Sequence, residues 1–264
     1  MRLPSKVLII TEGKDTEVGF FKRFIKVFKQ EDNIEIVPFS QNIKELYSLM
    51  QEYVFEGIYP NNTLEILRQQ PTITAEDKQK LMGKFSDIFL VFDLDIQNSV
   101  QFASLEEYLD IVEKLIIFFN DSTGRGQILI NYPMMESFRH IKTFKDPDYK
   151  NTNIPGSISF SKKYCNFLHK KGYVLDYNKF KLHNFNQIAA LNLIKANYIV
   201  CKNNERPNKF VYEDSLSQIN IFHKQRRLLM LKKPRMHVLN TSLFFYVDLY
   251  GKELFFNQRG DYLF

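Results

Sequence analysis

The feature that most constrains the fold is a short apolar run, Val7–Ile10, followed at once by Thr11-Glu12-Gly13. A continuous apolar run of this length is typical of a strand buried on both faces, because an amphipathic helix spreads its apolar residues three and four positions apart. In open parallel sheets, ligands bind at the carboxyl ends of the strands, where the N-termini of helices point their partial positive charge. Glu12 is therefore a candidate for chemistry.

The next segments repeat the alternation of strand and helix. A helix is predicted from about Asp15, with Val18, Phe21, Ile25 and Phe28 on one face, and a second strand at Ile34–Phe39. Strand, helix and strand without a hairpin signal favour a parallel βαβ unit. Further strands are predicted at Asp87–Phe92 and Gln127–Ile130. Between them Ser104–Phe119 is predicted as a helix, because Ser104 and Glu107 have the spacing of a capping box.

These patterns predict an α/β protein with a doubly wound parallel sheet of about four strands. We expect this domain to cover residues 1–132, with a mainly helical insertion at about 42–85 that contains helices at Ile43–Phe55 and Thr74–Phe85. Residues 133–264 are predicted to be a basic, mainly helical C-terminal region. Its first helix, Met134–Phe144, would carry Glu136 and His140 on one face, because they are four residues apart.

Charge is distributed unevenly along the chain. Residues 1–140 hold 15 Lys and Arg against 21 Asp and Glu, whereas residues 141–264 hold 21 against 9. A basic half is what a polyanion-binding surface needs, although a solubilising Lys-rich surface would give the same counts. The densest basic stretch is a candidate nucleic-acid contact and comprises Lys224, Arg226, Arg227, Lys232, Lys233 and Arg235.

Composition excludes some classes of protein. No apolar run approaches the roughly 20 residues of a membrane span, and the start of the chain lacks the pattern of a signal peptide, so we expect a cytoplasmic protein without a membrane partner. The two cysteines, Cys165 and Cys201, lie in no CxxC pair. We therefore expect both to be buried, small apolar side chains rather than zinc ligands or a disulfide.

A second acidic motif, Asp93-Leu94-Asp95, closes the predicted third strand. If the first and third strands are neighbours about 5 Å apart, Glu12, Asp93 and Asp95 converge on one small volume. Like charges converge favourably only around a cation, and hard carboxylate oxygens select Mg²⁺ or Mn²⁺ over zinc. The motif therefore predicts a divalent metal site, with Glu17 and Glu136 as further candidate ligands.

Glu12-Gly13 after a buried strand, Glu17 one turn into the helix and Asp93-x-Asp95 closing a later strand together resemble the Toprim domain. The resemblance covers roughly residues 5–132. It implies that Glu12 acts as general acid or base, that Asp93 and Asp95 hold Mg²⁺, and that the protein acts on nucleic acid. Lys14 lies where it could contact the substrate, or it is a surface lysine.

Within this family the Glu-Gly-Lys-x-Thr-Glu run and the later segment Asn131–Glu136 are similar to stand-alone Toprim nucleases of phage defence, of the RloB, abortive-infection and PARIS AriB types. The resemblance implies an endonuclease that acts in antiviral defence beside an ATPase partner and cleaves RNA, including transfer RNA, in preference to DNA. Whether the protein forms a homo-oligomer stays open.

Two alternatives remain. A Toprim module could bind nucleic acid or a partner protein without catalysis. A phosphatase of the haloacid dehalogenase type also has a strand-ending Asp-x-Asp, but that motif is expected early in the chain and would leave Glu12 without a role. His140 is expected to be a surface histidine of its helix rather than a catalytic residue.

Overall fold

The computed structural model describes residues 6–254, apart from 32, 53–62, 144–145, 147, 157–160 and 174. The chain forms two compact units. Unit 1 comprises the residues up to Asp93 together with Asp110–Leu129, and unit 2 comprises Leu94–Leu109 and the residues from Ile130 onward.

A mostly parallel five-stranded sheet is the framework of unit 1. Its strands lie in the order β2 (Ile34–Pro38), β1 (Val7–Thr11), β3 (Asp87–Asp93), β5 (Gly126–Asn131) and β4 (Asn120–Asp121). Strand β1 pairs in parallel with both β2 and β3, and the two-residue β4 pairs antiparallel with β5. The predicted α/β class and the neighbourhood of the first and third strands are confirmed.

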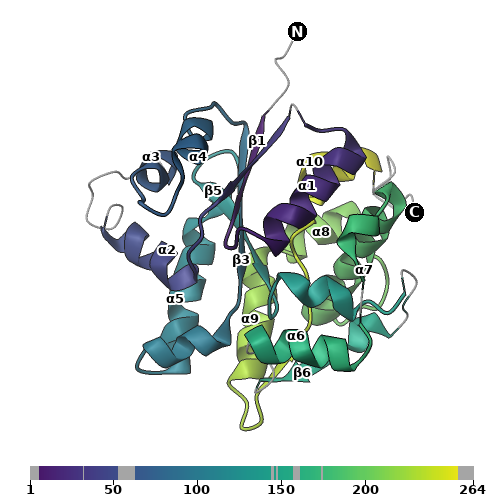
Figure 1. Ribbon diagram of the computed structural model, residues 1–264. Coiled ribbons are helices and arrows are strands. Elements are labelled where there is room, and N and C mark those ends of the chain that lie inside the picture. Colours follow the sequence, from purple (N-terminus) through teal and green to yellow (C-terminus); the bar gives the residue numbers. More distant parts are fainter. Residues whose placement is uncertain are drawn as a thin grey trace. The chain divides into compact units, whose positions relative to one another are not determined.

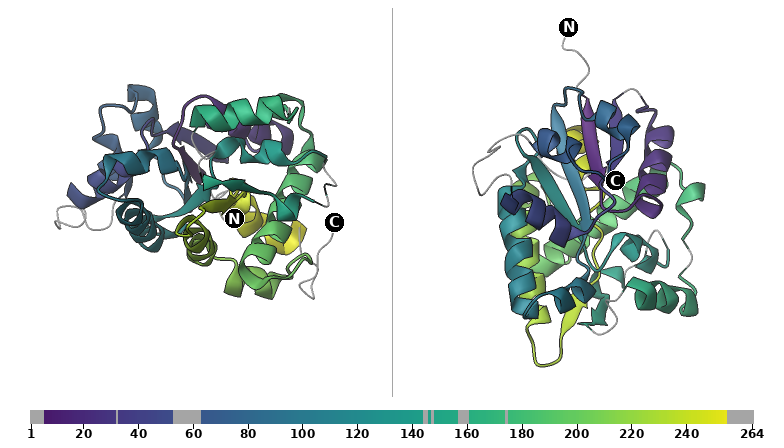
Figure 2. Two further views of the ribbon diagram at one scale, coloured as in Figure 1. Left: turned by 90° about the horizontal axis from the view of Figure 1, so that it is seen from below. Right: turned by 60° about the vertical axis from the view of Figure 1, so that its left-hand side comes forward.

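Burial explains why β1 and β3 read as apolar runs. All five residues of β1 are buried, and so are the six residues of β3 that follow Asp87. Helix α1 (Thr16–Phe28) covers one face of the sheet, and α2 (Ile43–Met50) and α5 (Leu105–Phe118) cover the other (Figures 1 and 2). Helix α1 buries Phe20, Phe21, Phe24 and Ile25. Helices on both faces are the reason that the central strands need no polar side.

The predicted insertion contains two further short helices, α3 (Thr63–Arg68) and α4 (Ala75–Lys80). Thr74 caps α4, because its hydroxyl accepts a hydrogen bond from the Asp77 backbone N–H at 3.1 Å. Ser104 caps α5, because its Oγ accepts a hydrogen bond from the Glu107 N–H. The Glu107 carboxylate accepts from the N–H of Ala103, one residue before the cap, so the predicted capping box is present only in part. The predicted end of the second helix at Phe55 lies outside the described residues.

Unit 2 is mainly helical within its described residues. Its helices are α6 (Ser161–Lys170), α7 (Leu182–Cys201), α8 (Lys209–Ser215), α9 (Gln218–Leu229) and α10 (Phe244–Leu254). Short 3₁₀ segments span Ile96–Gln101, Met135–His140, Tyr149–Asn151 and Tyr177–Lys179. Strands β6 (Asn153–Pro155) and β7 (Arg235–His237) form a small antiparallel pair that the sequence patterns did not reveal.

Candidate active site

The loop between β1 and α1 is fixed by its own polar groups. The Thr11 hydroxyl donates a hydrogen bond to the Gly13 carbonyl oxygen at 2.8 Å. The Glu12 backbone N–H donates to the Val91 carbonyl oxygen at 3.0 Å, so the β1–β3 ladder continues past the end of β1. The backbone of Glu12 is therefore held by the neighbouring strand rather than by a free loop.

The Glu12 side chain turns toward the end of β3. Its Oε2 atom accepts a hydrogen bond from the Asp93 backbone N–H at 2.8 Å. Glu12 and Asp93 are 81 positions apart in the chain, yet the structure brings them together at the carboxyl edge of two adjacent parallel strands. This is the edge at which ligands bind in open α/β sheets.

Gly13 leaves room for a second carboxylate. A Cβ atom at Gly13 would lie 2.6 Å from Oε2 and 2.8 Å from Oε1 of Glu17, a distance that real Cβ atoms do not reach. The Glu17 carboxylate, on the first turn of α1, thus lies directly against the Gly13 backbone. Lys14, the next residue of the loop, is exposed.

Asp95 lies in unit 2, two residues after the end of β3. One of its oxygens, Oδ2, accepts a hydrogen bond from Gln97 Nε2 at 3.1 Å. The other, Oδ1, is buried and has no hydrogen-bond partner. The pKa of Asp95 is raised to about 6, mainly by burial and further by the nearby Glu136 carboxylate, against the opposing effect of the hydrogen bond from Gln97. Such a carboxylate is costly unless a proton or a cation neutralises it.

Glu136 and His140 do not share a helical face, and that prediction was wrong. The segment Met135–His140 is a 3₁₀ helix. Two side chains four residues apart point about 120° away from each other around the axis of a 3₁₀ helix, but only about 40° apart in an α-helix. Glu136 is half-buried, whereas His140 is 3% exposed. The predicted end of this helix at Phe144 lies outside the described residues.

His140 is buried among aromatic rings rather than at the surface. It stacks on Tyr164 with the ring centroids 5.4 Å apart, and on Phe167 at 5.8 Å. Neither ring nitrogen has a hydrogen-bond partner. Burial and, to a smaller extent, the positive charge of Lys195 together lower the pKa of His140 to about 3. The imidazole is therefore neutral at physiological pH.

A buried polar network holds the segment that precedes Glu136. Asn131 Oδ1 accepts hydrogen bonds from the Thr241 backbone N–H and from Ser242 Oγ, both at 3.0 Å. The Asn240 side-chain amide donates to the Met135 carbonyl oxygen at 2.8 Å. All of these groups are buried, so their bonds are protected from water. The segment 131–136 is thus fixed by residues 240–242.

The prediction that both cysteines are buried was wrong. Cys165 is half-buried and Cys201 is exposed, and both are free. Burial raises the pKa of the Cys165 thiol, the charge of Glu136 raises it further, Arg139 lowers it and Asp95 raises it. A thiol with this environment stays protonated at neutral pH, which argues against a cysteine nucleophile at this position.

The predicted basic residues lie on α9 and on the segment that follows it. Arg227, Lys232, Lys233 and Arg235 are exposed, and Lys224 and Arg226 are half-exposed. Lys224 and Arg227 line a pocket of about 320 Å³ together with His223 and Asp214. The Gln225 side chain fastens this region to β7, because its amide donates to the His237 carbonyl oxygen at 2.9 Å and accepts from the His237 N–H at 3.0 Å.

Sequence reasoning placed Glu12 beside Asp93 but missed three contributors. Gln97, Asn131 and Ser242 were not proposed as site residues, although the first contacts Asp95 and the others fix the segment that carries Glu136. Among the described residues, no group of three or more His, Cys, Asp or Glu side chains is arranged to hold a metal ion. The predicted convergence of three carboxylates is thus not found as a preformed cluster in that part of the chain.

Comparison of the chain with protein-family models, with curated proteins and with solved structures finds no match. Within the described residues, no helix combines the length and apolar character needed to cross a membrane. The class that the fold defines is a mixed α/β protein with a mostly parallel sheet and a mainly helical second unit.

Proposed function

We propose that this protein is a Mg²⁺-dependent nuclease of the Toprim type, which hydrolyses phosphodiester bonds in nucleic acid. The observation that carries the proposal is the 2.8 Å hydrogen bond from the Asp93 backbone N–H to Glu12 Oε2. It supports a role for both residues at the carboxyl edge of β1 and β3, where the order glutamate, then Asp-x-Asp, resembles the Toprim motifs.

The available carboxylates suit Mg²⁺, which does not need to be enclosed by protein ligands. Mg²⁺ keeps several waters and is commonly bound through one or two carboxylates plus substrate phosphates, so a site of three preformed protein ligands is not required. Asp95 contributes a buried oxygen without a hydrogen-bond partner and a pKa raised to about 6. Both features describe a carboxylate that a divalent cation would stabilise. We propose Asp93 and Asp95 as ligands, with Glu17 and Glu136 as further candidates, and Mn²⁺ as an alternative ion.

When bound, Mg²⁺ supplies Lewis-acid polarisation of the phosphoryl oxygen and lowers the pKa of water. Glu12 accepts the proton of the attacking water, because its carboxylate is already oriented by the Asp93 N–H and needs no reorganisation. Gly13 has no side chain, and this leaves room for the Glu17 carboxylate, a further candidate ligand, against the loop backbone. Lys14 is exposed in the same loop and offers a positive charge to that phosphate.

The basic residues of unit 2 are the proposed nucleic-acid contact. Lys224, Arg227 and the exposed Lys232, Lys233 and Arg235 can neutralise backbone phosphates, which supplies sequence-independent affinity. RNA in preference to DNA, transfer RNA as a substrate, an ATPase partner and a role in antiviral defence follow from the resemblance alone and are proposed on that basis.

The test is cleavage of transfer RNA, single-stranded RNA, single-stranded DNA and duplex DNA in Mg²⁺ or Mn²⁺, with EDTA as the metal-free control. We expect cleavage to fall by about 10²-fold or more in Glu12→Gln, as for loss of a general base, and by a similar factor in Asp93→Asn, as for loss of a metal ligand. Asp15→Asn is the matched control, because Asp15 is an exposed acid of the same loop. It should leave the rate unchanged.

Three outcomes would contradict the proposal. Equal loss of activity in Asp15→Asn and Glu12→Gln would show a general effect of charge in the loop. Binding of nucleic acid without cleavage in any metal would favour a non-catalytic module. Release of phosphate from small monoesters, with no cleavage of polymers, would favour the phosphatase.

A further inference from the structure

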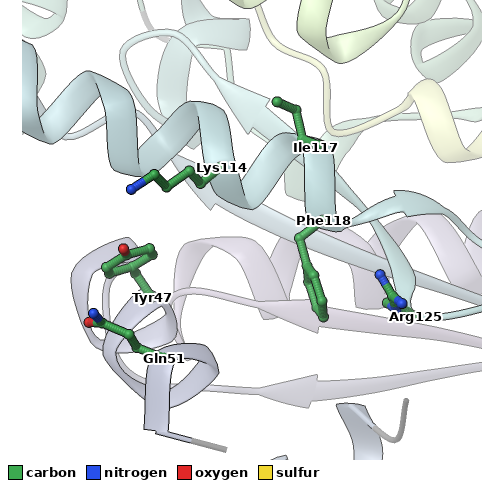
Figure 3. A pocket seen from close by; sticks show the side chains of 6 residues that line it. All are labelled: Tyr47, Gln51, Lys114, Ile117, Phe118 and Arg125. Carbon is green, nitrogen blue, oxygen red and sulfur yellow. The ribbon is translucent and has the colours of Figure 1, made fainter. Parts of the chain in front are cut away.

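A second region of unit 1 has the features of a ligand site. It is a pocket of about 550 Å³, within the ~300–1,000 Å³ typical of small-molecule sites. Its described lining residues combine aromatic, aliphatic, amide and cationic side chains: Tyr47, Gln51, Lys114, Ile117, Phe118 and Arg125. Figure 3 shows the Tyr47 and Gln51 side chains on one side and those of α5 and Arg125 on the other.

The Arg125 end of the pocket is distant from Glu12 and Asp93, and neither residue is among its described lining. Arg125 belongs to the turn before β5, and this turn is fastened to the amino end of β3, because Ser122 Oγ donates to Asp87 Oδ1 at 2.8 Å. Strand β3 runs from Asp87 to Asp93, and six residue steps of about 3.3 Å separate its ends by roughly 20 Å. The pocket is thus not part of the candidate active site.

Two positive charges define the polarity of the pocket. Lys114 and Arg125 are both exposed, and its described lining includes no carboxylate. Helices α2 and α5 end nearby, and each C-terminus contributes only about half a negative charge. The two full positive charges are larger, so the pocket attracts anions.

Both cations are placed against aromatic rings. Arg125 Cζ lies 4.7 Å from the centroid of the Phe118 ring, within cation–π distance of its face. Lys114 Nζ lies 6.0 Å from the centroid of the Tyr47 ring, at the outer limit of a cation–π contact. The ammonium can therefore turn toward a phosphate at little cost, which leaves the Tyr47 face for a planar group.

We infer that this pocket binds a nucleotide, with the phosphate between Lys114 and Arg125 and the base stacked on Tyr47. Gln51 offers both a donor and an acceptor to the edge of the base. A ligand that carries a phosphate and a planar aromatic group can contact the two cations with the phosphate and the tyrosine ring with the aromatic group. Such a group occurs both in free nucleotides and in single strands of nucleic acid, and the inference stands whether or not the protein is a nuclease.

The test is calorimetric binding to the full chain in EDTA, with 5′-AMP, a twelve-nucleotide single-stranded RNA and inorganic phosphate as probes. A Glu12→Gln background prevents cleavage from affecting the measurement. We expect Lys114→Ala and Arg125→Ala each to weaken binding of AMP or of the RNA by about tenfold, the scale of one charge-assisted hydrogen bond in an exposed site. Tyr47→Ala should weaken binding at least as much, and Tyr47→Phe should preserve it.

The charge-matched control is Lys22→Ala, because Lys22 is exposed on α1, on the other face of the sheet. Loss of AMP binding in the pocket variants identifies a free nucleotide as the ligand. If AMP does not bind to the protein but the RNA does, and the pocket variants lose RNA binding, the ligand is a single strand of nucleic acid. The inference is overturned if neither probe binds, if Lys22→Ala weakens binding as much as Lys114→Ala, or if inorganic phosphate binds as tightly as AMP.

Discussion

Asp95 should make the protein less stable at neutral pH than at acid pH, and Asp95→Asn should remove that difference. The pKa of Asp95 is raised to about 6 from 3.8, first because burial disfavours the charged form. A carboxyl group with a raised pKa contributes its stability when protonated, below about pH 4, and that contribution is lost as the pH rises through about 6.

The magnitude follows from the two pKa values. A difference of about two units corresponds to roughly 3 kcal/mol between pH 3.5 and pH 7.5, and partial solvent screening of a half-buried group reduces this to about 2 kcal/mol. Relative to the wild type, Asp95→Asn should therefore be stabilised by about 2 kcal/mol at pH 7.5 and hardly at all at pH 3.5. For a chain of this size the melting temperature should rise by about 4–8 °C at pH 7.5.

The assay is thermal and urea unfolding of both proteins across this pH range in EDTA, followed by the same measurement with Mg²⁺. The difference between the two proteins isolates Asp95 from other groups that titrate. Mg²⁺ should raise the melting temperature of the wild type more than that of Asp95→Asn, since the variant lacks one of the two proposed aspartate ligands. A variant less stable than the wild type at pH 7.5, or a pH-independent difference, would refute the reasoning.

Three further predictions concern the two units. Gly13→Ala should reduce nuclease activity by about tenfold or more without unfolding the protein, because the new methyl group displaces the Glu17 carboxylate; cleavage assays and circular dichroism test this. Gly126→Ala should lower the free energy of unfolding by about 1–3 kcal/mol in urea titrations, because Gly126 has a φ of +109° and a Cβ would lie 2.6 Å from Leu90 Cδ1. The pKa of about 3 for His140 makes the stability of the wild type fall as the pH drops below 6.5. His140→Phe removes this loss, so the free energy of unfolding of the variant relative to the wild type should be about 2 kcal/mol higher at pH 5 than at pH 8 in unfolding measurements.

The sheet could be predicted from the sequence because its information is local. Strands β1 and β3 are buried on both faces, so their residues are almost uniformly apolar and their ends are marked by the first polar side chains. Helix α5 was predictable for the same reason, since Ser104 and Glu107 mark its start within four residues. The pairing of β1 with β3 follows from the order of the elements and the rules of parallel sheets.

The segment Met134–His140 shows where local patterns fail. Its spacing of apolar residues is compatible with an α-helix, yet Met135–His140 forms a 3₁₀ helix. The reason is that groups far away in the sequence form hydrogen bonds with this segment. The Met135 carbonyl oxygen accepts from Asn240, which is 105 positions later, and Asn131 bonds to Thr241. No local periodicity encodes such partners, so the burial of His140 could not be predicted either.

The same long-range network bears on the candidate site. Asn131 is buried, and its Oδ1 atom already accepts hydrogen bonds from the Thr241 N–H and from Ser242 Oγ. This oxygen is therefore not available to contact a substrate. Its role is to hold the backbone that leads to Glu136, whose charge raises the pKa of Asp95. Asn131 thus fixes the position of Glu136, and the effect of the Glu136 charge on the pKa of Asp95 is the physical reason to test this pair of carboxylates for cation binding.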